Sequence, residues 1–191
     1  MYWDPMPTVV ASAELPVVGE KDRRLGDPDD YCRGLWEERD WRNVPGPFYG
    51  AATDSCWMGR LIAQDHIVYE DGMGSEVVFR QPRDARETRL LLSAAWVDPF
   101  RAYACDGDAH WTVELIRDWW ADRAKVAEWL GRLEREWSVH DRDQEREAAD
   151  GLRAYSRYLD NGLETALREY TFWLDNGRPA HSHERLPSLG R

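Results

Sequence analysis

Cysteine chemistry is the first possibility that the residue types suggest. Cys56 would be a nucleophile if a histidine, His66 or His110, served as its base and Asp54 oriented that base. The alternative is a small buried hydrophobic residue, which is the usual role of a lone cysteine beside a tryptophan, and we favour it. The same stretch, residues 53–60, supplies three candidate binding residues: Asp54, Trp57 and Arg60.

A second polar cluster lies at residues 106–110, where Asp106, Asp108 and His110 fall close together. Carboxylate oxygens of this kind suit a divalent cation. The later ligands of an EF-hand loop do not follow at their usual offsets, however. We therefore expect a loop whose aspartates form a turn and whose polar end starts the helix at Trp111, and we expect no bound metal.

Arginines gather at residues 80–83, where Arg80 and Arg83 flank the point at which a strand is expected to pass into a helix. A helix N-terminus beside arginines can hold an anion or the phosphate of a nucleotide. The alternative is a solvated helix face on which Arg86 and Arg89 pair with neighbouring carboxylates. We favour the solvated face, because exposed ion pairs of this kind are common and individually weak.

Three large rings, Trp41, Phe48 and Tyr49, lie on the segment WRNVPGPFYG at residues 41–50. Two prolines around a glycine prevent regular structure in this segment. Rings on such a loop either pack inward or dock onto a partner, since aromatic residues are common in interface hot spots. The sequence leaves both roles open.

Composition narrows the classes of function. The 191 residues carry a net charge of −11, and a field of that sign repels phosphate backbones and anionic lipid. We therefore expect no direct binding to nucleic acid or membrane, and a basic protein partner is favoured. Three widely spaced cysteines cannot supply the clustered thiolates of an iron–sulfur cluster, so we expect no cofactor and a colourless protein. Free thiols, with no signal pattern and no long apolar run, favour the cytoplasm.

The pattern along the chain predicts an α+β fold with a small antiparallel sheet. Residues 1–30 resemble an extended arm, and residues 31–191 a single α+β domain whose sheet-containing part covers about 41–101. A short helix is expected at 29–40, and a longer one from about Asp84 to Trp96 with Asp84 near its start. Alternating hydrophobicity predicts strands at 57–63, 66–71 and 75–81, the last two joined by a hairpin turn at 71–74.

The C-terminal part predicts a long antiparallel helical hairpin over about 112–176. Apolar residues at helical spacing mark one helix at 112–137 and a second from Gln144, which bends at Asn161-Gly162 and is capped by Gly177. A glycine inside a helix costs only about 1 kcal/mol, so a bend is expected rather than a break. Two long helices joined by a short connection pack antiparallel.

Three segments carry a resemblance: WRNVPGPFYG at 41–50, TDSCW at 53–57 and VFRQPR at 78–83. Together they resemble a family of small uncharacterised actinobacterial proteins, some of which are loosely labelled ferredoxin. The resemblance covers roughly residues 41–186 and implies an actinobacterial cytoplasmic protein. It transfers no catalytic residue, and the cysteine count contradicts the ferredoxin label for this chain.

These observations favour a non-catalytic cytoplasmic protein-binding module, plausibly an acidic inhibitor of the immunity-protein type. The rival is a small ligand- or nucleotide-binding domain, or an enzyme, with a site between the loops 45–60, 80–83 and 106–110. A third hypothesis is a structural subunit of a larger assembly. Convergence of those loops on one pocket with tryptophan walls would favour the rival, and their dispersal would favour the interaction module.

Overall fold

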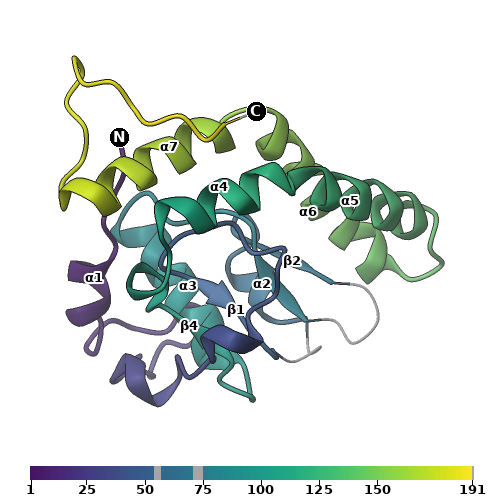
Figure 1. Cartoon of the computed structure of the whole chain (residues 1–191). Helices are drawn as coiled ribbons and strands as arrows, with labels where there is room; N and C mark the ends of the chain where they lie inside the picture. The colour runs from purple at the N-terminus through teal and green to yellow at the C-terminus, as the bar shows by residue number, and fades with distance from the viewer. Residues whose placement is uncertain (54–56, 71–74, 191) are drawn as a thin grey trace. The chain divides into compact units, whose positions relative to one another are not determined.

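The computed structural model describes residues 1–53, 57–70 and 75–190 (Figure 1). Over these residues the chain is α+β, with seven α-helices and two small antiparallel sheets. It divides into two compact units: the N-terminal unit, Trp3–Ala109, and the C-terminal unit, His110–Arg191 together with Met1–Tyr2. No helix in the described ranges is both long enough and apolar enough to cross a membrane.

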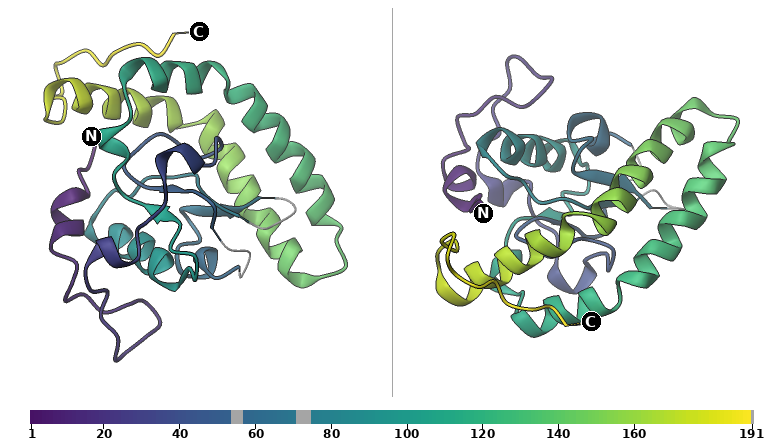
Figure 2. Two further views of the ribbon diagram at one scale, coloured as in Figure 1. Left: turned by 60° about the horizontal axis from the view of Figure 1, so that its bottom comes forward. Right: turned by 90° about the horizontal axis from the view of Figure 1, so that it is seen from above.

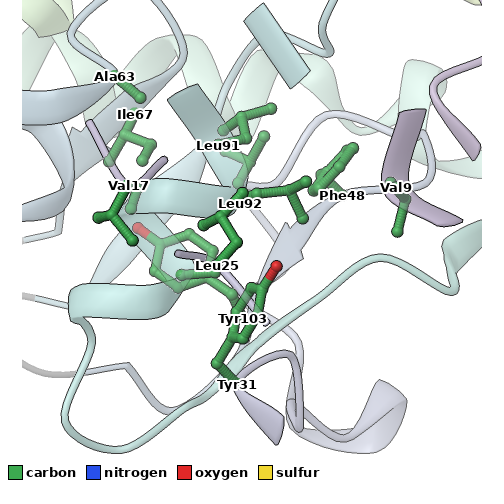
Figure 3. Close-up of a cluster of buried hydrophobic side chains, with 13 residues drawn as sticks. Val9, Val17, Leu25, Tyr31, Phe48, Ala63, Ile67, Leu91, Leu92 and Tyr103 are labelled. Carbon is green, nitrogen blue, oxygen red and sulfur yellow. The ribbon is translucent and has the colours of Figure 1, made fainter. Parts of the chain in front are cut away.

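The core of the N-terminal unit is built around helix α3 (Ala85–Val97). This helix begins as predicted, because the Asp84 side chain accepts a hydrogen bond from the Glu87 backbone N–H at 2.7 Å. Helices α1 (Met6–Val10) and α2 (Gly59–Ile62) both contact it. Figure 3 shows the buried cluster that includes Leu91 and Leu92 of α3, together with Val9, Val17, Leu25, Tyr31, Phe48, Ile67 and Tyr103.

The strands of this unit form two separate antiparallel pairs. Strand β1 (Tyr49–Gly50) pairs with β4 (Tyr103–Ala104), and β2 (Ile67–Tyr69) pairs with β3 (Glu76–Val78). The second pair lies within the predicted strands at 66–71 and 75–81, and the predicted turn at 71–74 lies outside the described residues. Every residue of β2 and β3 is buried, so the expected alternation of buried and exposed positions is absent from these strands.

The predicted strand at 57–63 is wrong. Residues Gly59–Ile62 form the single turn of α2, and the Ala63 backbone N–H donates to the Gly59 carbonyl at 2.8 Å. Trp57 has a φ of 60°, which lies in the left-handed region and cannot belong to a strand. Leu61 is 72% exposed, so this apolar run does not supply a buried strand.

Residues 3–30 pack within the N-terminal unit and include helix α1. Val9 and Val17 are buried in the core and hold this segment in place, whereas Val10 is exposed. Two hydrogen bonds connect the segment to α3: the Val18 N–H donates to the Ser93 hydroxyl, and the Arg89 side chain donates to the Pro16 carbonyl. The short helix predicted at 29–40 is replaced by two 3₁₀ turns, Pro28–Asp30 and Trp36–Glu38.

In its described residues the C-terminal unit has four helices where the sequence predicted two (Figure 2). Helix α5 packs against α6, and α4 and α6 each contact α7. The predicted apolar phase holds in part: Leu130, Leu133, Leu152 and Leu163 are fully buried, whereas Leu115 is 37% exposed. The four helices are α4 (Val113–Ala121), α5 (Arg123–Ser138), α6 (Asp143–Asp160) and α7 (Leu163–Asn176).

The helices are interrupted at Asp122 and at Asn161-Gly162, and the two interruptions differ in their local contacts. At the first break, the Arg123 guanidinium donates to the Trp120 carbonyl at 2.7 Å and lies 4.2 Å from the centre of the Trp120 indole. At the second, Asn161 is extended and Gly162 has a φ of 112°, which favours glycine. The expected bend at this position is therefore a full interruption of the helix. Gly177, with a φ of 64°, caps α7 as predicted.

Candidate functional site

Segment 43–50 is where the three predicted loops meet, and one side of it is held by Gln81. The Gln81 side-chain N–H groups donate to the carbonyls of Val44 at 3.0 Å and Phe48 at 2.8 Å. Its side-chain oxygen accepts from the Phe48 backbone N–H at 3.1 Å. The amide of Gln81 thus pairs with the irregular loop as a neighbouring strand would, which explains how a segment with two prolines is held in one conformation.

The other side of segment 43–50 is held by the 106–109 loop. The Tyr49 hydroxyl donates to Asp106 Oδ1 at 2.8 Å, and the Gly107 backbone N–H donates to the Pro47 carbonyl at 3.0 Å. Burial, together with the hydrogen bond to Asp106, raises the pKa of Tyr49 far above its usual value. The hydroxyl therefore stays protonated and acts as a permanent donor to this carboxylate.

Asn43 joins β1 to β3 from inside the unit, where its side chain is buried. Its side-chain oxygen accepts from the backbone N–H groups of Gly50 at 3.0 Å and Val78 at 2.8 Å. Its side-chain N–H groups donate to the carbonyls of Asp40 and Gly50, each at 2.7 Å. One amide thereby makes four hydrogen bonds, the full number that an asparagine side chain ordinarily makes.

We call this junction of segment 43–50 with Gln81 and the 106–109 loop the hub. The loops do converge, but the described residues of the hub pack directly against one another, with Phe48 and Tyr49 each only 1% exposed. These two predicted binding residues therefore belong to the core. Trp41 precedes the hub and remains 47% exposed, so of the three rings it is the one that a partner can reach.

Two further predicted binding residues, Trp57 and Arg60, have structural contacts beside β2. The Trp57 ring packs on Tyr69 with 4.3 Å between the ring centres, and its carbonyl accepts from the Tyr69 hydroxyl. The Arg60 guanidinium donates to the carbonyls of Gln64 and Ile67, which ties α2 to the start of β2. The candidates Asp54 and Cys56 lie outside the described residues.

The predicted anion site at residues 80–83 is occupied by the protein's own carboxylates. Asp84 fills the N-terminus of α3, and the Arg83 side chain binds Glu87 through two hydrogen bonds, at 3.2 and 2.7 Å. The Arg80 guanidinium lies 5.5 Å from the centre of the Phe79 ring. The expected pairing of Arg86 and Arg89 with neighbouring carboxylates is not found among the described residues: Glu87 pairs with Arg83, which precedes the helix, and the Arg89 side chain donates to the Pro16 carbonyl.

The predicted polar cluster at 106–110 is divided between the two units. Asp106 and Asp108 lie in the N-terminal unit, where Gly107–Ala109 form a 3₁₀ turn, as expected of a turn-forming loop. His110 belongs to the C-terminal unit. In the parts of the chain that the structure describes, no group of three or more histidine, cysteine or acidic side chains is arranged to hold a metal ion.

A buried carboxylate, Glu76 on β3, was not singled out from the sequence. It is 4% exposed, accepts a hydrogen bond from the Gly59 N–H at 2.9 Å and accepts another from the Tyr103 hydroxyl. Burial and the nearby Glu76 raise the pKa of Tyr103 well above its usual value. Glu76 and Asp98 border a cavity of about 10 Å³, room for about one water molecule. The sequence signal that could have identified Glu76 is the presence of a glutamate within an otherwise apolar predicted strand.

A larger, open hollow also borders the turn that follows α3. Its volume is about 370 Å³, and Val97, Asp98 and Pro99 line both it and the small cavity beside Glu76. Tyr31 and Trp96 also border it, with Tyr31 only 4% exposed. None of these residues was singled out from the sequence, because the two aromatic residues lie far apart along the chain and only the fold brings them together.

His66 is the buried titratable group with the clearest consequence for stability. Its ring is 1% exposed, and its Nδ1–H donates to the Arg80 carbonyl at 2.9 Å. Burial lowers the pKa of His66 below its usual 6.5, although Glu87, 3.9 Å from Nε2, acts to raise it. The folded protein therefore holds this imidazole neutral at pH values where the unfolded chain would protonate it.

Acidification from pH 7 to 5 is therefore expected to destabilise the protein through His66. The unfolded chain takes up a proton near pH 6.5 that the folded state cannot, so stability is greatest above that pH and falls below it. The loss is about 1.4 kcal/mol for each unit by which the folded pKa is lowered. Denaturant unfolding over this pH range measures it.

His66→Asn is the matched control, because its side-chain N–H can still donate to the Arg80 carbonyl. This variant should show a flatter dependence of stability on pH between 7 and 5. Glu87 contributes only at lower pH: burial acts to raise its pKa, but hydrogen bonds from Arg83 outweigh that effect and hold it below 4.5. Equal slopes for the wild type and His66→Asn would contradict the assignment.

No family model, curated protein or solved structure matches the chain. The resemblance carried by residues 41–50, 53–57 and 78–83 is not tested by these comparisons and stays a prediction.

Proposed function

We propose that the chain is a non-catalytic module that binds a basic protein, as an acidic inhibitor of the immunity-protein type does. The observation that carries the proposal is Trp41. Its indole is half-exposed and is held in place by neighbouring residues, and the protein that presents it is strongly acidic. Tryptophan is the residue most enriched among interface hot spots. The proposal assigns no catalytic residue.

The Trp41 side chain is held in place by contacts with the residues next to it in the sequence. The Arg42 guanidinium lies 4.9 Å from the centre of the Trp41 ring and is itself paired with Asp40 at 2.6 Å. The Arg42 side chain is only 13% exposed, and the next residue, Asn43, is fixed by its four hydrogen bonds. An aromatic side chain that is already ordered loses little conformational freedom when a partner covers it, which favours affinity.

The acidity supports a basic partner. A net charge of −11 attracts a basic protein over the range of its field, and that range shrinks to about 8 Å at physiological ionic strength. Charge of this kind mainly accelerates encounter, whereas a few buried aromatic contacts determine how slowly the complex dissociates. The two contributions can therefore be measured separately.

Trp41→Ala is expected to weaken the complex about 30-fold or more, which corresponds to about 2 kcal/mol. The wild-type protein should recover a stoichiometric basic partner from its native cytoplasm, and association of the purified pair should slow markedly as salt is raised. Stopped-flow and calorimetric measurements of the pair give the rate and the affinity. Trp41→Ala should raise the dissociation rate constant, whereas added salt should lower the association rate constant.

Trp3→Ala is the matched control, since Trp3 is a partly exposed tryptophan of the same unit, at 38%. It should bind the partner as the wild type does, and circular dichroism should show both variants folded. If Trp41→Ala binds the partner with wild-type affinity, or no basic partner is recovered, the interaction proposal is wrong.

The rival, a ligand- or nucleotide-binding domain or an enzyme with its site among the three loops, receives less support from the described residues. Gln81 and Asp106 are engaged with backbone and side-chain groups of the hub, and Arg83 is engaged with Glu87. A ligand at this place would have to displace those contacts. Stabilisation of the protein against heat by a nucleotide, with no protein partner, would revive this alternative.

Two finer expectations complete the proposal. We infer that α5 and α6 form an antiparallel hairpin, supported by their short connection and by the ion pair at 2.9 Å between Arg153 on α6 and Glu134 on α5.

We also infer a cytoplasmic location, supported by the cysteine content of the sequence. A fusion to a compartment-specific reporter tests the location.

A further inference from the structure

Cys32 and Cys105 are the two free cysteines among the described residues, and the fold brings their thiols together. They are 73 positions apart in the sequence, yet their side chains are hydrogen-bonded to each other. Both are partly buried and pack against the core cluster that includes Leu91 and Leu92 of α3. Two thiols in contact are the starting arrangement for a disulfide bond.

Backbone contacts hold the two cysteines beside each other. Cys32 forms an isolated antiparallel β-bridge with Ala102, and two residues later the Gly34 N–H donates to the Tyr103 carbonyl at 2.9 Å. Cys105 directly follows strand β4. The contact between the two thiols therefore rests on paired segments of backbone and not on two flexible side chains that meet by chance.

The surroundings of the pair are acidic and partly open to solvent. The hydrogen bond with Cys105 and burial raise the pKa of the Cys32 thiol well above its usual value, and the nearby charges of Asp106 and Asp29 act in the same direction. Cys32 therefore keeps its proton near neutral pH. Each cysteine retains some exposed surface, so a small oxidant can reach the pair. The negative charges favour an uncharged oxidant over an anionic one.

We propose that Cys32 and Cys105 form a reversible intramolecular disulfide when a hydroperoxide oxidises them. The deprotonated Cys105 sulfur attacks one oxygen of hydrogen peroxide, the O–O bond breaks, and the departing hydroxide takes up the Cys105 proton as water, which leaves a sulfenic acid. The Cys32 sulfur then attacks the sulfenic sulfur, the S–O bond breaks, and the hydroxyl leaves with the Cys32 proton as a second water. The two thiols lose two electrons, and one peroxide is reduced to two waters.

The disulfide joins the segment that carries Cys32 covalently to the edge of the hub. Cys105 directly precedes Asp106, whose carboxylate accepts the hydrogen bond from the Tyr49 hydroxyl. A cross-link between residues so far apart in sequence restricts the unfolded chain much more than the folded one, so oxidation stabilises the N-terminal unit. In a reducing compartment such a bond is transient and follows the level of peroxide. This modification is separate from recognition of a basic protein through Trp41.

Oxidation of the reduced whole chain with one equivalent of hydrogen peroxide tests the proposal. The protein should lose the mass of two hydrogen atoms, and its free thiols should fall from three to one. Proteolysis and mass spectrometry should recover Cys32 linked to Cys105, and dithiothreitol should restore both thiols. The oxidised protein should melt higher than the reduced one by several degrees. No intramolecular disulfide, a disulfide that contains Cys56, or an unchanged or lower melting temperature after oxidation would overturn the proposal.

Three serine variants test the roles of the two sulfurs, while the wild-type measurement decides the disulfide itself. Cys56→Ser is the matched control and should form the same disulfide as the wild type. Cys32→Ser should form none and should stop at a Cys105 sulfenic acid, which dimedone traps. Cys105→Ser should form none and should take up dimedone at Cys32 at least tenfold more slowly. Equal dimedone labelling of Cys32 and Cys105 in these two variants would overturn the assigned order of attack.

Discussion

Replacement of Asn43 by alanine should destabilise the N-terminal unit by about 3–5 kcal/mol, a large share of the stability of an ordinary domain. The change removes the acceptor of two buried backbone N–H groups, those of Gly50 and Val78, and water does not reach either position. Each orphaned donor costs about 1–3 kcal/mol. Denaturant unfolding followed by circular dichroism measures the loss.

Gln64→Ala serves as the control, because Gln64 is an exposed amide residue of the same unit. It should change stability by no more than about 0.5 kcal/mol, as surface substitutions usually do. Asn43→Asp gives a second comparison. It keeps the acceptor for Gly50 and Val78 but loses the donors to two carbonyls and buries a charge, so it should also be strongly destabilised. A stable, folded Asn43→Ala would show that the junction of β1 and β3 does not depend on this side chain.

Gly50→Ala should be almost as damaging, for a steric reason. A Cβ at position 50 would lie 2.1 Å from the Glu76 backbone carbonyl oxygen, far inside contact distance. The clash is with backbone rather than with a flexible side chain, so β1 and β3 would have to separate. We expect a loss of several kcal/mol, comparable to that of a severe overpacking substitution (about 1–3 kcal/mol or more). The melting temperatures of Gly50→Ala and the wild type, measured by thermal unfolding, test this expectation.

The matched control is Gly131→Ala on α5, where the nearest atom to an added Cβ belongs to the Arg135 side chain at 3.4 Å. Here the same substitution should stabilise the protein by up to about 1 kcal/mol, because glycine is a poor helix former. The two variants therefore carry the same chemical change with opposite expected signs. If Gly50→Ala melts no lower than the wild type, the close approach of β1 to Glu76 is not a feature of the protein in solution.

The sequence predicted the elements that are stabilised by contacts between residues close together in the chain. Helix α3 was predicted with Asp84 near its start, and the capping hydrogen bond from the Glu87 N–H to Asp84 spans three residues. The apolar phase of the C-terminal helices was also predicted, since burial of Leu152 and Leu163 follows from helical spacing alone. The break at residue 122 was not predicted, and the break at 161–162 was predicted only as a bend, because periodicity does not register a local change of backbone conformation.

The hub shows why the roles of the candidate site residues were not predicted. Phe48 and Tyr49 were equally compatible with a core and with an interface, and the contacts that decide between them come from Gln81 and Asp106. Nothing in the local sequence indicates that the side chains of Asn43 and Gln81 replace strand neighbours. The hollow was missed for the same reason, since Tyr31, Trp96 and Arg101 come from three separate segments.

The hub also constrains the order in which the chain can fold. Its hydrogen bonds join residues that are 33, 35 and 57 positions apart, through Gln81, Val78 and Asp106 respectively. Contacts of such sequence separation form slowly, because a long loop must close before they contribute any stability. During synthesis the hub cannot close until residue 106 has left the ribosome. Until then Phe48 and Tyr49, which the hub buries, remain accessible, and exposed apolar surface of this kind favours aggregation of an incompletely folded chain.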